Sequence, residues 1–245
     1  MTDTTLQTLI DDPAIESVEI KLTVRDDQEQ LVHDALGHAH VKAEHRVIYF
    51  FDTNDLELYE SGLVLRARKI KGHTDNSTVK LRPVDPAQIP EQWKGRAEFH
   101  IEMDVVGEKF VCSAKVDSDE KRGEIDEVVA GERAMEKLFS GVQEELIKDY
   151  APADVDWSVL VPLGPIEVRK WEFEPEGLDH ELTVEMWVLP DGTDLVELSI
   201  KVDPAEAESS RADLASYLAG GGFDIEGDQK TKTKTALAYF TNQQL

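Results

Sequence analysis

The stretch from Leu63 to Arg82 holds two short runs in which cationic side chains recur at every second position. Arg66 and Arg68 lie in the first run, and Lys80 and Arg82 lie in the second. Residues two apart in an extended chain share a face, so each pair points one way. The turn-rich GHTDNS between the runs predicts a β-hairpin that brings all four cations onto one surface. Because like charges repel at a cross-strand spacing of roughly 5 Å, we expect an anion among them.

The chain as a whole is acidic, which narrows the class of anion. Its 245 residues include 51 Asp and Glu against 26 Lys and Arg, for a formal charge of −25. A field of this sign repels polyanions, so we expect neither nucleic acid nor an anionic membrane as a partner. A small anionic ligand would have to bind in a shielded site, and 40% apolar residues suffice for the core of a soluble globular protein.

Three features of the sequence favour the cytoplasm. No apolar run reaches the roughly 18 residues that span a bilayer. The N-terminal MTDTTLQTLIDDPAIE is acidic, whereas a secretory signal is basic and then apolar. The single cysteine, Cys112, excludes an internal disulfide and suits a reducing compartment. The sequence leaves the oligomeric state open.

Alternation of apolar and polar residues predicts most of the chain to be strands. The expected strands are Ser17–Val24, Arg46–Asp52, the two runs of the hairpin, Gly95–Val106, Pro165–Glu174, His180–Leu189 and Asp194–Asp203. Helical spacing is expected at about 28–39, from about 126 to a terminating Gly141, and at 204–220. Eight strands without βαβ alternation predict an α+β fold, an antiparallel eight-stranded β-barrel with flanking helices.

We expect one domain over residues 1–245, in which a helical region joins strand groups at about 16–125 and 160–240. In a closed barrel whose apolar faces are covered by helices, the charged faces of all strands would line one lumen. Cations there would neutralise phosphate oxygens, while Glu side chains would hold Mg²⁺ or Mn²⁺ and orient a water for in-line attack. On a single strand, charged residues at every second position are ordinarily explained by a polar face in contact with solvent. Here, however, such spacing of charged residues recurs on five strands.

A set of short motifs occurs in order over roughly residues 16–239: SVEIK, YFFDT followed by LRAR, VKLR, RAEF, VRKW, VELS and TKTKTALAY. In order and spacing the set resembles the CYTH or triphosphate-tunnel metalloenzyme superfamily, which includes class IV adenylate cyclases, thiamine triphosphatases and inorganic triphosphatases. The resemblance implies an eight-stranded antiparallel tunnel that binds a triphosphate compound or nucleotide together with Mg²⁺ or Mn²⁺.

Carried over by position, the resemblance implies roles for particular residues. The phosphate-binding set it implies is Lys21, Arg66, Arg68, Lys80, Arg82, Arg169, Lys232 and Lys234. The carboxylates it implies for the metal are Glu19, Glu98, Glu185 and Glu197. Glu19, Lys21 and Glu197 would be the catalytic residues.

Three positions depart from the family pattern. Ser17 replaces the first Glu of the N-terminal signature, and Ser199 replaces the second Glu of the late Glu-x-Glu pair. His100 stands where a second carboxylate is common. A hydroxyl is a poor substitute for a carboxylate at Mg²⁺, so the departures weaken the metal-binding half of the site and leave the cationic half intact.

Three functions therefore stay open. The leading one is metal-dependent hydrolysis of a triphosphate compound, inorganic or small organic. The second is binding of a polyphosphate or nucleotide without turnover, because metal carboxylates are depleted. The third is cyclisation of ATP by an adenylate cyclase. The lysine-rich C-terminal segment is predicted to be either a solvated tail or a flap that closes over the bound anion.

Overall fold

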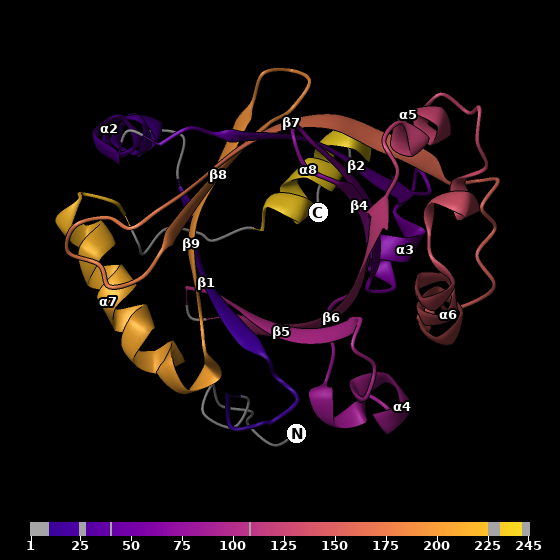
Figure 1. Cartoon of the computed structure of the whole chain (residues 1–245), viewed down its shortest axis with the longest axis horizontal. Helices are drawn as coiled ribbons and strands as arrows, with labels where there is room; N and C mark the ends of the chain where they lie inside the picture. The colour runs from indigo at the N-terminus through magenta and orange to yellow at the C-terminus, as the bar shows by residue number, and fades with distance from the viewer. Residues whose placement is uncertain (1–9, 25–27, 40, 108, 225–230, 242–245) are drawn as a thin grey trace.

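The computed structural model describes residues 10–24, 28–39, 41–107, 109–224 and 231–241. In this part of the chain nine strands close into a barrel, with helices packed around its outside (Figure 1). The strands are β1 Ser17–Val24, β2 Glu44–Asp52, β3 Leu63–Ile70, β4 Asp75–Leu81, β5 Phe99–Val106, β6 Lys109–Glu120, β7 Val161–Phe173, β8 Leu182–Val188 and β9 Asp194–Val202. No helix among the described residues has the length and apolar character to cross a membrane.

Around the barrel the strands follow the order β1-β5-β6-β4-β3-β2-β7-β8-β9, and β9 pairs again with β1. The β1–β5 pair is parallel and the other pairs are antiparallel. The α+β barrel with flanking helices is confirmed, but eight antiparallel strands is wrong. The additional strand is β6, whose consecutive apolar residues Phe110, Val111 and Cys112 hide the alternation that marks the other strands.

Helices cover the outside of the barrel. They are α2 Glu29–Ala39, α3 Glu57–Glu60, α4 Glu91–Lys94, α5 Glu124–Val129, α6 Gly141–Tyr150 and α7 Ala207–Gly220, with 3₁₀ turns η2 Pro86–Gln88, η3 Met135–Leu138 and η4 Pro204–Glu206. The prediction that Gly141 ends a helix is wrong. Ser140 and Gln143 instead form a capping box that starts α6 at Gly141.

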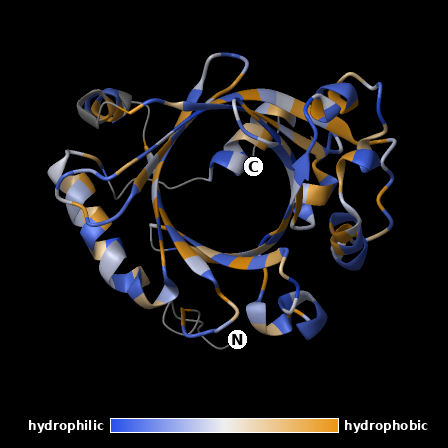
Figure 2. Ribbon diagram, viewed as in Figure 1, coloured by the Kyte–Doolittle hydropathy of each residue, from blue (hydrophilic) through white to orange (hydrophobic). Residues whose placement is uncertain are grey.

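Hydrophilic and hydrophobic residues alternate along much of the barrel strands (Figure 2), and successive side chains of a strand point to opposite faces, here the covered outer face and the lumen. In β1, Val18, Ile20 and Leu22 are buried, whereas Glu19 and Lys21 face the lumen. The outer apolar faces and the helices form the main hydrophobic core. The charged side chains of the inner strand faces therefore point into the lumen.

The C-terminal helix α8, Lys232–Thr241, differs from the others because it lies within the ring of strands (Figure 1). Its Ala236 and Leu237 are buried in a second, smaller hydrophobic cluster with Ile48, Phe50 and Trp187. Phe50 and Trp187 also line the lumen, so this cluster fills part of the interior. The C-terminal segment is therefore a packed helix, and the alternative of a solvated tail is wrong for residues 232–241.

Gln143 fastens α6 to the barrel wall. Its side chain is fully buried, and its amide nitrogen donates to the carbonyl oxygens of Ser77 at 3.1 Å and Val116 at 3.0 Å. Its amide oxygen accepts from the Ser77 hydroxyl at 3.0 Å and from the Ser140 backbone N–H at 2.9 Å. One side chain thus joins a helix cap to two neighbouring strands.

We expect Gln143→Ala to lower the free energy of unfolding by roughly 2–4 kcal/mol, since it removes one of the two hydrogen bonds of the capping box and leaves buried polar groups short of partners. Urea denaturation followed by circular dichroism measures this loss. Glu144→Ala, at the exposed neighbouring position of the same helix, is the control and should cost far less. Equal losses in the two variants would contradict the role given to Gln143.

Candidate functional site

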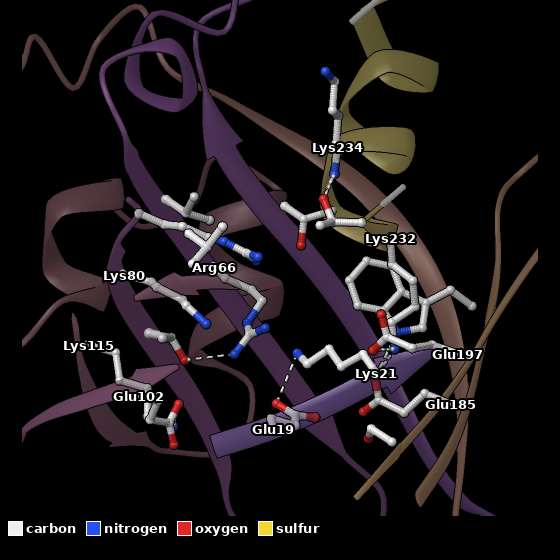
Figure 3. A pocket seen from close by; sticks show the side chains of 18 of the residues that line it. Glu19, Lys21, Arg66, Lys80, Glu102, Lys115, Glu185, Glu197, Lys232 and Lys234 are labelled. Carbon is white, nitrogen blue, oxygen red and sulfur yellow. Dashed lines mark hydrogen bonds and ion pairs between the residues drawn. The ribbon is translucent and has the colours of Figure 1, made fainter. Parts of the chain in front are cut away.

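A cavity of about 890 Å³ occupies the barrel lumen. Side chains from all nine strands and from α8 line it, and Figure 3 shows Arg66 and Lys80 on one side of it and Glu185 and Glu197 on the other. Among the described residues, eleven of the chain's 26 Lys and Arg line the cavity, against seven of its 51 Asp and Glu. The lumen therefore has the opposite sign of charge to the molecule as a whole.

Most of the residues predicted to bind phosphate lie around this cavity. Those that line it are Lys21, Arg66, Arg68, Lys80, Arg82, Lys232 and Lys234. Arg169 does not line it, because its side chain is exposed on the outer face of β7 while the next residue, Lys170, lines the lumen. Because successive residues of a strand point to opposite faces, Arg169 lies apart from the predicted phosphate-binding residues of the lumen, and the prediction that grouped it with them is corrected.

The predicted carboxylates divide in the same way. Glu19, Glu185 and Glu197 line the cavity, but Glu98 is exposed just before β5 begins and lies away from it. His100 is not part of the lining either, and its Nδ1 lies 2.8 Å from Glu16 Oε2. Of the two serine positions that depart from the family pattern, Ser199 is buried and lines the cavity.

The anion expected among the basic residues of the hairpin is in part a side chain of the protein itself. Asp104 of β5, which is 1% exposed, accepts Lys21 Nζ at 2.9 Å and lies 3.2 Å from Arg82 Nη1 and 3.6 Å from Lys80 Nζ. Burial alone would raise the pKa of Asp104, but the three cations outweigh it and hold the pKa well below its usual range. One carboxylate thus neutralises part of the charge of three lumen cations.

Glu102, on the same face of β5, forms a second ionic cluster. Its carboxylate lies 2.8 Å from Lys201 Nζ and 3.1 Å from Lys115 Nζ. Burial opposes ionisation, yet the charges of Lys115 and Lys201 prevail and lower the pKa of Glu102 to about 2. This carboxylate is therefore ionised at neutral pH and engaged with cations.

Arg66 and Arg68 have a single ion-pair partner between them among the residues that the structure describes. Arg66 Nη2 donates to Thr78 Oγ1 at 3.3 Å, and its buried Nε has no hydrogen-bond partner in the described part of the chain. Arg68 donates from Nε to Asn76 Oδ1 at 2.9 Å, and its Nη2 is 3.8 Å from Asp117 Oδ1. Burial lowers the pKa of Arg66, and the charge of Arg66 together with burial lowers that of Arg68 to about 9. An added anion would stabilise both guanidinium groups.

The opposite wall carries paired carboxylates that already hold a cation. Glu185 of β8 and Glu197 of β9 are cross-strand neighbours. Lys232 Nζ forms ion pairs with both, at 3.1 Å from Glu197 Oε1 and at close contact with Glu185 Oε2. Arg46 Nη1 is 3.7 Å from Glu185 Oε1. Burial opposes ionisation of Glu185, but Lys232 outweighs it and keeps the pKa of Glu185 well below its usual range.

These carboxylates do not form a fitting site for Mg²⁺ or Mn²⁺. Among the described residues, no group of three or more His, Cys, Asp or Glu side chains converges as a metal site would require. An ammonium group lies between Glu185 and Glu197, and Glu19 is paired at 2.9 Å with Lys21. The donor set that the family resemblance implies is therefore engaged with lysines.

Several lumen residues were not among the predicted site residues. They include Arg46, Glu102, Lys115, Lys170 and Lys201, which line the cavity, and Asp104, which pairs with Lys21 beside it. The signal for Glu102 and Asp104 was their place on the same strand face as His100. Lys115 could not be found because β6 was not recognised. Lys170 was missed because either face of β7 can be taken for the inner one from its sequence.

The barrel is shared with solved structures of low sequence identity. A candidate adenylate cyclase from Bacillus halodurans superposes with a TM-score of 0.63 at 13% identity, over 90% of this chain and 97% of that one. A candidate adenylyl cyclase from Hippeastrum, described as having a dominant triphosphatase activity, gives a TM-score of 0.62 at 19% identity, over 94% of this chain and 98% of that one. No protein-family model and no curated protein matches the sequence. At these identities, the similarity establishes the fold.

The depressed pKa of Glu102 predicts a loss of stability in acid. A carboxylate with a folded-state pKa below the unfolded value stabilises the protein above the unfolded pKa, and this contribution is lost as the pH falls through the folded value. For Glu102 the range runs from pH 4.5 down to about 2. The free energy of unfolding, measured with urea across this range, should fall less steeply in Glu102→Gln than in the unmodified protein. Identical slopes would contradict the ionic cluster.

Proposed function

We propose that the lumen binds a linear triphosphate, either inorganic triphosphate or the triphosphate group of a small organic molecule. The observation that carries the proposal is the Arg66–Arg68 pair of neighbouring buried guanidinium groups. Within the described residues, Asp117 is the one carboxylate that forms an ion pair with them, at 3.8 Å from Arg68 Nη2. Planar guanidinium groups suit phosphate oxygens because each presents a fork of N–H donors.

The arrangement of the remaining cations supports a ligand with several negative charges. Lys21, Lys80 and Arg82 gather around Asp104, which fixes their positions but balances only part of their charge. Both groups of cations line the same cavity, whose volume of about 890 Å³ is within the range of ordinary small-ligand sites. A chain of phosphates can contact both groups, whereas a single small anion would engage one.

The similarity in fold to the Bacillus halodurans and Hippeastrum proteins, together with the sequence motifs, supports a triphosphate-binding function of the CYTH type. Metal-dependent hydrolysis, which the resemblance implies, needs Glu19, Glu185 and Glu197 to be available to a divalent ion. Because these carboxylates are paired with Lys21 and Lys232, we place binding ahead of turnover. Cyclisation of ATP would use the same phosphate-binding surface, and product identity separates it from the other two.

Arg66→Ala should weaken binding of inorganic triphosphate roughly 10- to 150-fold, the equivalent of about 1.5–3 kcal/mol for hydrogen bonds to a charged group. Isothermal titration calorimetry in buffer containing EDTA measures the affinity. Arg169→Ala is the matched control, since it removes an arginine from the outer face of the same barrel and should leave the affinity unchanged. Comparable losses in both variants would point to a non-specific charge effect.

A free-phosphate assay on the same titrated samples, supplied with Mg²⁺ or Mn²⁺, tests for turnover. We expect saturable binding in EDTA and no phosphate release above the buffer level. Metal-dependent release that Glu19→Gln abolishes would favour the triphosphatase instead, and cyclic AMP formed from ATP would favour the cyclase. If the protein does not bind triphosphate under either condition, the proposed function is wrong.

A further inference from the structure

We propose that the Lys232 ammonium group is a built-in cation that takes the place of a divalent metal between Glu185 and Glu197, so that the lumen recognises its anion without metal. The inference deepens the proposed triphosphate binding and rests on it. The family resemblance assigns Glu185 and Glu197 to a metal ion, but in this chain a lysine from the C-terminal helix lies between them.

The position of Lys232 is fixed from several sides. Its side chain is only 6% exposed, and Nζ forms ion pairs with the carboxylates of both glutamates. The ammonium group also lies 5.1 Å from the centroid of the Trp187 ring, within reach of a cation–π interaction. Trp187 Nε1 in turn donates to Glu185 Oε2 at 3.3 Å. A lysine this enclosed is a structural cation, unlike a surface ion pair held by flexible side chains.

The packing of α8 explains how the lysine stays at this depth. One helical turn further along, Ala236 and Leu237 are buried against Ile48, Phe50 and Trp187 inside the barrel. Lys232 and Ala236 are four residues apart and share a helix face. Apolar burial of that face therefore carries the ammonium group to the carboxylates, and the helix itself supplies the positive charge between them.

Charge balance favours a lysine here over an added divalent ion. Glu185 and Glu197 bring two negative charges, which Lys232 and the nearby Arg46 balance. A Mg²⁺ or Mn²⁺ ion entering the same place would have to displace the ammonium group and leave it buried without its partners, which is strongly unfavourable. Ser199, two residues from Glu197 in the lining of the cavity, adds a hydroxyl and no carboxylate, which fits this arrangement because one ammonium group needs fewer oxygen ligands than a divalent ion.

Lys232→Met tests the inference, because it removes the charge and keeps an apolar side chain of similar length. We expect this variant to gain saturable binding of about one Mn²⁺ per chain, measured without phosphate by the loss of the free-ion signal in electron paramagnetic resonance. The unmodified protein should show no such binding. In EDTA, the variant should bind inorganic triphosphate at least about tenfold more weakly than the unmodified protein.

Three further variants serve as controls. Lys234→Met removes another lumen lysine of the same helix and should not create a Mn²⁺ site. Lys232→Arg keeps a positive charge and should bind no Mn²⁺. Adding Glu185→Gln to Lys232→Met should abolish the gained Mn²⁺ binding, which locates the ion. Urea denaturation confirms that each variant is folded.

The outcomes separate this inference from the proposed function. If the unmodified protein binds Mn²⁺ as strongly as Lys232→Met does, the role given to Lys232 is wrong, even if triphosphate binds. The same holds if neither protein binds Mn²⁺. If Lys232→Met does not fold, the unmodified protein and its Glu185→Gln variant still test the inference. Mn²⁺ binding by the unmodified protein that is abolished in Glu185→Gln would overturn the role of Lys232, and no Mn²⁺ binding by the unmodified protein would support it. Failure of triphosphate binding in the unmodified protein, by contrast, refutes the proposed function and leaves the Mn²⁺ measurement interpretable.

Discussion

Neutralisation of charge inside the barrel is the constraint on which the rest of the structure depends. Asp104 illustrates it, because this buried carboxylate contacts cations from β1 and from the end of the β3–β4 hairpin while lying on β5 itself. It sits at the one parallel seam of the barrel, where β5 pairs with β1. Buried ion pairs add little net stability over apolar packing, but removal of one partner is costly. We infer that Asp104 helps fix the pairing of the strands more than it raises the overall stability.

Stability comes instead from two apolar regions with different roles. The main core lies between the strands and the outer helices and holds the barrel together. The second cluster, around Leu237 and Trp187, lies inside the barrel and fastens α8 there. This division leaves the rest of the lumen open to charged side chains. It also ties the C-terminal helix to the site, so that packing in one part of the lumen determines which charges face the other part.

The sequence predicted the barrel because its strand signals are simple. In β1 every second residue is apolar, and the charged faces of several strands have the same period. The pattern is ambiguous in two strands. β6 begins with consecutive apolar residues, and both faces of β7 carry charged side chains, so alternation alone does not show that Lys170, and not Arg169, faces the lumen. The sequence could not show which charged side chains pair with one another, because Asp104, Lys21 and Lys80 are brought together only by the strand order of the closed barrel. No spacing in the sequence shows that Lys232 lies between Glu185 and Glu197.

The opposite signs of charge inside and outside bear on which anions the lumen accepts. The chain carries a formal charge of −25, yet Lys and Arg outnumber Glu in the lining of the cavity. At physiological ionic strength the field of exposed charges is screened beyond about 8 Å, whereas charges enclosed in the lumen are screened far less. A long polyanion would keep most of its charges in the repulsive region outside the barrel. If the lumen binds a triphosphate as proposed, all of the ligand's charge lies inside the barrel with Arg66, Arg68 and the cations around Asp104, and we expect the acidic exterior to favour such a short anion over a polymer.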